Sequence, residues 1–132
     1  MQILTHQAID QKLCGRPMEV EEGASRVELI TLPSMCADEC GLVHGGFVFG
    51  LADYAAMLAV NHPNVVLGAA DVEFLKPVRV GETICAHAKV EQVGGKKHRV
   101  SVSVDRDGEI IFKGIYTCFV LESHILESTG KR

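Results

Sequence analysis

Aromatic side chains are scarce in this 132-residue sequence, which has no Trp, two Tyr and five Phe. Because 47% of the residues are nevertheless hydrophobic, the core must be largely aliphatic. A basic excess is also lacking, since 17 acidic residues outnumber 13 basic ones and the net charge is −4. A basic surface is what nucleic-acid binding requires, so we expect no nucleic-acid partner.

Membrane and secretion signals are missing as well. The longest apolar run, 41–60, is interrupted by Asp53 and thinned by glycines, so it predicts a core helix and not a membrane span. The start of the chain, "MQILTHQAIDQKLCG", lacks the charged end, apolar centre and cleavage site of a signal peptide. We therefore expect a cytoplasmic protein with no membrane partner.

Paired cysteines are not expected either, because the five cysteines are odd in number and form no CxxC motif. Cys36, Cys40 and His44 recur every four residues and would share one face of a helix. Pro33 and Gly41 argue against a continuous helix there, and no fourth ligand is obvious. We expect no metal site.

The chain has the length of one domain, 1–132. Three segments flank its central part: a short helix from Thr5 through Leu13 within a helix-and-loop region 1–24, a first strand over 25–32, and a polar tail over 122–132. Residues 34–43 are expected to form a loop that leads into a long apolar helix.

That helix is predicted over 45–61, where His62-Pro63 stops it. Apolar residues then recur with period two, which predicts four strands over 64–78, 82–93, 97–107 and 109–121. Gly94-Gly95 and Asp107-Gly108 are hairpin signals, so these strands should be antiparallel. We expect an α+β fold in which a curled antiparallel sheet wraps around one long central helix, with leftover apolar surface covered by a second subunit.

The first two residues of the long helix are glycines, Gly45 and Gly46. Their backbone N–H groups have no intrahelical acceptor, and the positive end of the helix dipole lies beside them. One interpretation is an oxyanion hole, because glycine lets a ligand oxygen approach the backbone closely. The other is that the glycines serve only close packing or a tight turn, and the sequence does not separate the two.

Asp53 is the one carboxylate on this helix, and its neighbours at helical spacing are apolar. A buried carboxyl of this kind is a candidate general base or nucleophile with a raised pKa, or else a hydrogen-bonded structural residue. Gly45 and Asp53 are separated by about 12 Å along a helix axis. They can act on one substrate group only if Gly45 of one subunit faces Asp53 of another across a two-fold axis.

The segment "HGGFVFGLADYAAMLAVN" resembles the helix motif of PaaI-type hotdog-fold acyl-CoA thioesterases, of the 4-hydroxybenzoyl-CoA thioesterase superfamily. The strand segment "DVEFLKPVRVGE" is similar to the same family, and the resemblance extends from about Val27 to Val120. It implies hydrolysis of an acyl-CoA to free acid and CoA at an interface of a homodimer or homotetramer. No cofactor is implied beyond the CoA of the substrate.

The resemblance also implies residue roles. Gly45 would polarise the thioester carbonyl, Asp53 would activate water or attack, and His44 would orient the loop or the thioester, unless it only bonds the backbone. Lys76 and Arg79 are candidates for the CoA phosphates. The remaining substrate-binding candidates are Gly46, Phe49, Met57, Leu67 and Gly68, with Phe47, Tyr54 and Leu58 as further candidates for the acyl pocket.

Two positions depart from the family pattern. Asp38 stands where many members have an asparagine, and Leu67 and Gly68 stand near the usual Ser or Thr. Asp38 is kept as a candidate acid or base. The departures leave open an alternative, a hotdog protein that binds an acyl-CoA or small ligand without turnover. A hydratase of the same fold is disfavoured, because "CGLVHGG" lacks the proline of that motif.

Overall fold

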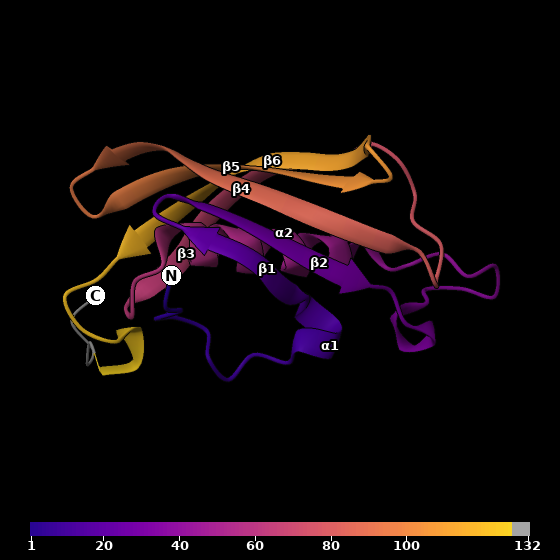
Figure 1. Cartoon of the computed structure of the whole chain (residues 1–132), viewed down its shortest axis with the longest axis horizontal. Coiled ribbons are helices and arrows are strands. Elements are labelled where there is room, and N and C mark those ends of the chain that lie inside the picture. Colours follow the sequence, from indigo (N-terminus) through magenta and orange to yellow (C-terminus); the bar gives the residue numbers. More distant parts are fainter. Residues whose placement is uncertain (128–132) are drawn as a thin grey trace.

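A computed structural model describes residues 1–127 of the chain. One six-stranded antiparallel sheet, in the order β1-β2-β4-β5-β6-β3, curls around the long helix α2 (Gly45–Val60), as Figure 1 shows. The predicted fold class is therefore confirmed. None of the helices within residues 1–127 combines the length and hydrophobicity needed to cross a membrane.

The strands and short helices have the following bounds: α1 Gln11–Cys14, β1 Arg16–Glu21, β2 Ala24–Ile30, β3 Val65–Phe74, β4 Thr83–Gly94, β5 Lys97–Arg106 and β6 Glu109–Val120, with 3₁₀ turns at Pro33–Met35 and Ile125–Glu127. The long helix and the four later strands lie where the periodicity predicts them. The β4–β5 and β5–β6 connections are the expected hairpins, with positive φ at Gly95, Asp107 and Gly108.

β3 does not pair with its successor in sequence but with β6, at the far edge of the sheet. The connection between β3 and β4 therefore leads from an edge strand to an interior strand, and β6 and β5 lie between the two in the sheet. No other strand of residues 1–127 pairs with the outer edge of β3. Along this ten-residue strand, the backbone N–H and C=O groups that point away from β6 are unpaired, and such an edge can pair with another strand.

The prediction for the N-terminal region was wrong in two respects. The helix is only α1, whose cap is Asp10, and Thr5 is instead a buried residue bonded to His6. Region 1–24 also contains a strand, β1, which forms a hairpin with β2. β1 escaped notice because it contains Pro17 and charged residues, and its exposure lacks a clear period of two.

The C-terminal segment 122–132 is predicted as a polar tail. Ile125–Glu127 forms a 3₁₀ turn, and the side chain of Leu126 is 84% exposed. Residues 128–132 of the predicted tail lie outside the described residues.

The core lies between α2 and the face of the sheet that it contacts. Leu51, Ala55 and Leu58 of α2 are fully buried against side chains such as Ile84 and Val104. Two hydrogen bonds fix the helix on the sheet. The Ser25 hydroxyl donates to the Ala55 carbonyl (2.6 Å), and the Tyr116 hydroxyl donates to the Phe49 carbonyl (3.2 Å). The rotation of α2, and hence the direction of Asp53, is set by these contacts.

Gly114 of β6 offers a test of this packing, because it lies opposite Val72 of β3. A Cβ at Gly114 would lie 2.5 Å from Val72 Cγ1 and 2.8 Å from the Asp71 carbonyl oxygen. We expect Gly114→Ala to lower the free energy of unfolding by about 1–3 kcal/mol, as overpacking does. Gly94→Ala is the control, since nothing lies within 4 Å of its Cβ position. Urea denaturation followed by circular dichroism measures both, and equal effects would contradict the prediction.

Candidate active site

The N-terminal end of α2 follows a short structured loop. His44 is the N-cap residue, with extended backbone (φ −61, ψ 132), and its N–H donates to the Met35 carbonyl (2.9 Å). The N–H groups of Gly45 and Gly46 therefore open the helix without intrahelical acceptors. Gly45 borders a cavity of about 260 Å³ together with Val48, Phe74 and other apolar residues.

Both glycines also serve close packing. A Cβ at Gly45 would lie 3.1 Å from the Phe74 ring, and one at Gly46 would lie 3.0 Å from the His44 ring. The exposed His44 ring stands edge-on to Phe47, and its side chain makes no capping hydrogen bond. The packing interpretation is thus supported by geometry, and it leaves the N–H groups available for a ligand oxygen.

Asp38 lies in the loop that precedes the HGG motif, and its side chain is exposed. Its Oδ1 accepts hydrogen bonds from the N–H groups of Cys40 (2.9 Å) and Leu42 (3.2 Å), and its carbonyl accepts from the Cys36 thiol. These bonds give Asp38 a part in shaping the loop. Its catalytic role stays a prediction.

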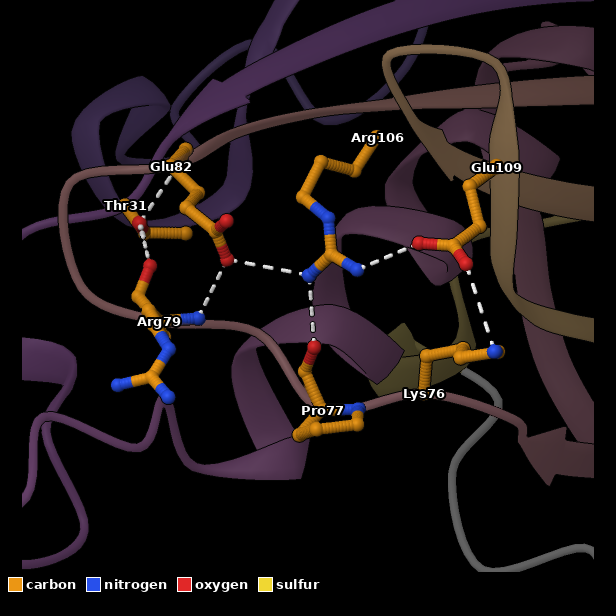
Figure 2. A network of polar contacts seen from close by, with 7 residues as sticks. All are labelled: Thr31, Lys76, Pro77, Arg79, Glu82, Arg106 and Glu109. Atoms are coloured by element: carbon orange, nitrogen blue, oxygen red, sulfur yellow. Dashed lines mark hydrogen bonds and ion pairs between the residues drawn. The ribbon is translucent and has the colours of Figure 1, made fainter.

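We call the segment 36–44, which leads into α2, the HGG loop. A second loop, 75–82, lies beside it and is held by Arg106 of β5. Figure 2 shows the Arg106 guanidinium at the centre, donating to the Pro77 carbonyl (2.7 Å) and pairing with Glu82 (3.1 Å) and Glu109 (2.8 Å). Only 19% of the Arg106 side chain is exposed, so these contacts are better shielded from solvent than an ordinary surface pair.

Backbone bonds then attach this loop to the HGG loop. The N–H of Val43 donates to the Val78 carbonyl (2.9 Å), and the N–H of Val80 donates to the Gly41 carbonyl (2.8 Å). Two loops consequently support the start of α2. The Arg106 contacts hold the second of these loops, 75–82, in place.

The two basic candidates of this loop differ in availability. The Lys76 ammonium pairs with Glu109 (3.4 Å). The Arg79 guanidinium points away from the polar network in Figure 2 and has no partner within the part of the chain that the structure describes. Arg79 is accordingly the better placed of the two to meet an anionic group, while Lys76 must first exchange its partner.

Asp53 lies two turns further along α2, at a separate cavity of about 390 Å³. Met57 and Leu67, both predicted to bind substrate, border this cavity as well. Burial raises the pKa of the Asp53 carboxyl from its ordinary value to about 6, and its Oδ1 is buried without a hydrogen-bond partner among the described residues. The structural alternative, a hydrogen-bonded carboxylate, therefore lacks its partners here.

Other predicted residues have structural surroundings. The Phe49 ring packs on Tyr116, with ring centroids 5.3 Å apart. Gly68 lies at a β-bulge, where a Cβ would collide with the Phe119 ring at 2.3 Å. Tyr54 and Leu58, proposed for the acyl pocket, are buried in the core.

Sequence reasoning missed the N-terminal segment at the Asp53 cavity. Thr5 and His6 border the cavity, and Thr5 Oγ1 lies 2.7 Å from His6 Nδ1. Burial lowers the pKa of His6, which favours a neutral ring. The segment is held by Asn61, the C-cap of α2, whose amide group bonds the backbone of Gln2 and Leu4. No local sequence pattern marks this segment, because the residue that holds it, Asn61, lies 57 positions away from Leu4 in the sequence.

Gly45 and Asp53 thus border different cavities at different points of α2. Within one chain the two residues stay apart, because their spacing along the helix keeps them apart. A site that uses both groups must contain two copies of the chain.

Comparison with known protein families places this geometry in context. The model of the thioesterase superfamily matches residues 40–111, more than half of the chain. The chain belongs to the thioesterase superfamily. The match includes the last part of the HGG loop, α2, β3, β4, β5 and the first residues of β6, and it leaves out β1 and β2. A solved structure from Pyrococcus horikoshii is 52% identical, with a TM-score of 0.94, and the alignment covers 96% of this chain and 97% of that one.

Curated relatives carry diverse names. A methylthioribose-1-phosphate isomerase of Aquifex aeolicus is 51% identical over 92% of this chain. The transcription factor FapR of Shouchella clausii is 29% identical over 66% of the chain, and a putative esterase of Archaeoglobus fulgidus is 33% identical over 64%. This chain spans 27%, 46% and 55% of the lengths of those three proteins, respectively.

The burial of Asp53 predicts a pH-dependent cost to stability. Its folded-state pKa of about 6 exceeds the unfolded value of about 3.9. Burial of the charged form therefore lowers the free energy of unfolding progressively between about pH 4 and pH 6, and the full cost is present above that range. We therefore expect the free energy of unfolding of Asp53→Asn, relative to that of wild type, to increase by about 2–3 kcal/mol between pH 4 and pH 7.5. Urea denaturation at both pH values measures the difference, and Asp107→Asn, at an exposed turn, is the control. A pH-independent difference would show that the Asp53 pKa is ordinary.

Proposed function

We propose that this chain is an acyl-CoA thioesterase that hydrolyses its substrate to a free acid and CoA at a site shared by two copies. The observation that carries the proposal is Asp53, a carboxyl with an unpartnered, buried Oδ1 and a pKa near 6 at the wall of a cavity. Membership of the thioesterase superfamily supports the reaction class. A general base works best when its pKa lies near the operating pH, and Asp53 meets that condition.

The need for two copies follows from the separation of Gly45 and Asp53. Antiparallel packing of two α2 helices about a two-fold axis brings Gly45 of one chain towards the partner subunit's Asp53 and creates two equivalent sites. The unpaired edge of β3 gives a second reason, since pairing of two such edges extends the sheet and satisfies the exposed backbone. The expected assembly is a dimer, which can pair further into a tetramer.

In the proposed mechanism the thioester carbonyl oxygen accepts a hydrogen bond from the Gly45 N–H, at the positive end of the helix dipole. Asp53 takes a proton from water, and the resulting hydroxide attacks the carbonyl carbon. The tetrahedral intermediate then collapses, the carbon–sulfur bond breaks, and the CoA sulfur leaves with a proton returned by Asp53. Arg79, with its guanidinium turned outward, is assigned to the CoA phosphates.

Ligand binding without turnover is the second candidate function. It is favoured by Asp38, whose carboxylate is engaged in the loop, and by the apolar Leu67 at the cavity. The similarity to the transcription factor FapR also shows that a related sequence occurs in a protein that is not named as an enzyme. The two functions differ in a single measurable respect, the release of free CoA.

The first test of the proposal is thiol release from short, long and aromatic acyl-CoAs. We expect Asp53→Asn to lower kcat by about 10²–10⁴-fold, the usual contribution of a general base, while acyl-CoA binding persists. Wild-type kcat/KM should rise with pH through about 6, because the ionised carboxyl is the active form.

The control variant for this test is Asp107→Asn, which removes an equal charge at the exposed β5–β6 turn and should keep full activity. Binding of acyl-CoA without release of thiol by wild type would reject the thioesterase and leave the ligand-binding function. Turnover that survives in Asp53→Asn would reject the role of Asp53.

The shared site is tested by Gly45→Pro, which removes the N–H at the first helical position. Proline is tolerated there, and the extended backbone of His44 suits the residue before a proline. We expect Gly45→Pro to be nearly inactive, whereas Gly45→Ala, which keeps the N–H, should retain more activity. If the two variant homodimers are inactive and the subunits exchange freely, an equal mixture of Gly45→Pro and Asp53→Asn subunits should recover about a quarter of wild-type activity, because half the dimers then contain one intact site.

Subunit exchange must be verified for this experiment, by mixing tagged and untagged chains and isolating the tagged fraction. Mixed dimers that form without recovering activity would contradict a site built from Gly45 and the partner subunit's Asp53.

A further inference from the structure

The face of the sheet turned away from α2 carries a group of three side chains with metal-binding chemistry. Cys85 and His87 are alternate residues of β4, and their neighbours Ile84 and Ala86 are buried on the helix side. Asp105 of β5 is the register partner of Cys85. The three side chains therefore emerge together on the outer face, far from the cavities of the candidate active site.

The three potential ligand atoms are already close to one another. They all lie within 4.8 Å, and His87 Nε2 lies 2.9 Å from Asp105 Oδ1. Within the described chain this is the one group of three or more Cys, His, Asp or Glu side chains with such spacing. Because Cys85 and His87 share a strand and Asp105 lies on the adjacent one, a continuous hydrogen-bonded ladder fixes their backbones.

The surroundings orient the carboxylate. The N–H of Gly108, in the β5–β6 turn, donates to Asp105 Oδ2 (3.0 Å), which leaves Oδ1 directed at His87. Support of this kind for a ligand is typical of metal sites. His87 also borders a surface hollow of about 610 Å³, so the cluster is accessible from solvent.

Charged side chains on the neighbouring strand β2 shift the pKa of Cys85 in opposite directions. On β2, Glu28 lies opposite Cys85 and Arg26 lies opposite His87. Burial raises the pKa of the Cys85 thiol, Arg26 lowers it, and the charges of Asp105 and Glu28 raise it further. The Arg26 guanidinium is itself paired with Glu19 of β1 (2.7 Å).

We propose that Cys85, His87 and Asp105 bind one zinc-like divalent metal ion per chain. A thiol, an imidazole and a carboxylate are the ligand types that Zn²⁺ takes, and three protein ligands leave a fourth position for water. Binding requires the Cys85 proton to leave for solvent, so affinity should increase with pH. The ion would link β4 and β5 on the outer face, and it has no part in the proposed hydrolysis.

This site differs from the pattern considered in the sequence, Cys36, Cys40 and His44. Those residues do not form a ligand cluster among the described residues. The new cluster is dispersed in sequence over Cys85-x-His87 and Asp105, and only strand pairing unites it.

The test is titration of the full-length, reduced protein with Co²⁺ alone, followed by the absorption of thiolate-bound cobalt. We expect one equivalent per chain with a sulfur-to-cobalt band. Cys85→Ser should abolish the band, and His87→Gln and Asp105→Asn should weaken binding at least tenfold. The control is Cys36→Ser combined with Cys40→Ser, which removes two exposed thiols and should leave the band unchanged.

A second measurement guards against variants that simply misfold. Zn²⁺ should raise the Tm of wild type and of the Cys36/Cys40 control but not of Cys85→Ser, and circular dichroism verifies the fold of each. The proposal is overturned if wild type gives no thiolate band. It is also overturned if the band survives in Cys85→Ser or disappears in the Cys36/Cys40 control, either of which would mean adventitious binding at other thiols.

Discussion

The burial of one apolar helix against a curled sheet is the constraint on which the rest of this protein depends. α2 is covered along most of its length, and the bonds from Ser25 and Tyr116 fix its rotation. Its backbone N–H groups can meet a ligand only at the first turn, and its carboxylate only where a cavity reaches Asp53. Packing therefore determines which groups of α2 can contact a ligand, whatever the ligand is.

This constraint explains why the two ends of the helix are built differently. The N-terminal end is braced by the HGG loop and by loop 75–82, which Arg106 holds through shielded ion pairs and a hydrogen bond to Pro77. The Asp53 cavity is instead closed by segments from both ends of the chain, including Thr5, His6 and Ile125. A braced backbone N–H donor and a partly enclosed carboxyl suit the shared site that we propose.

The face of the sheet turned away from α2 does not pack against the helix, and it is richer in polar side chains. Alternation along β4 and β5 directs apolar residues to α2 and places Cys85, His87 and Asp105 outside. A metal there would act on the sheet and not on the thioester, so the two proposals stand or fall separately.

The sequence by itself determined the fold class, the span of α2 and the four later strands, because apolar periodicity and the Gly and Pro signals are local properties of the chain. It also singled out Gly45 and Asp53 as candidates, and their spacing means that a site using both groups needs two copies of the chain. Tertiary structure alone decided that β3 lies at a sheet edge, that β1 exists, and that His6 borders the same cavity as Asp53. It alone united Cys85, His87 and Asp105. These features depend on contacts between residues distant in sequence, and no local pattern encodes such contacts.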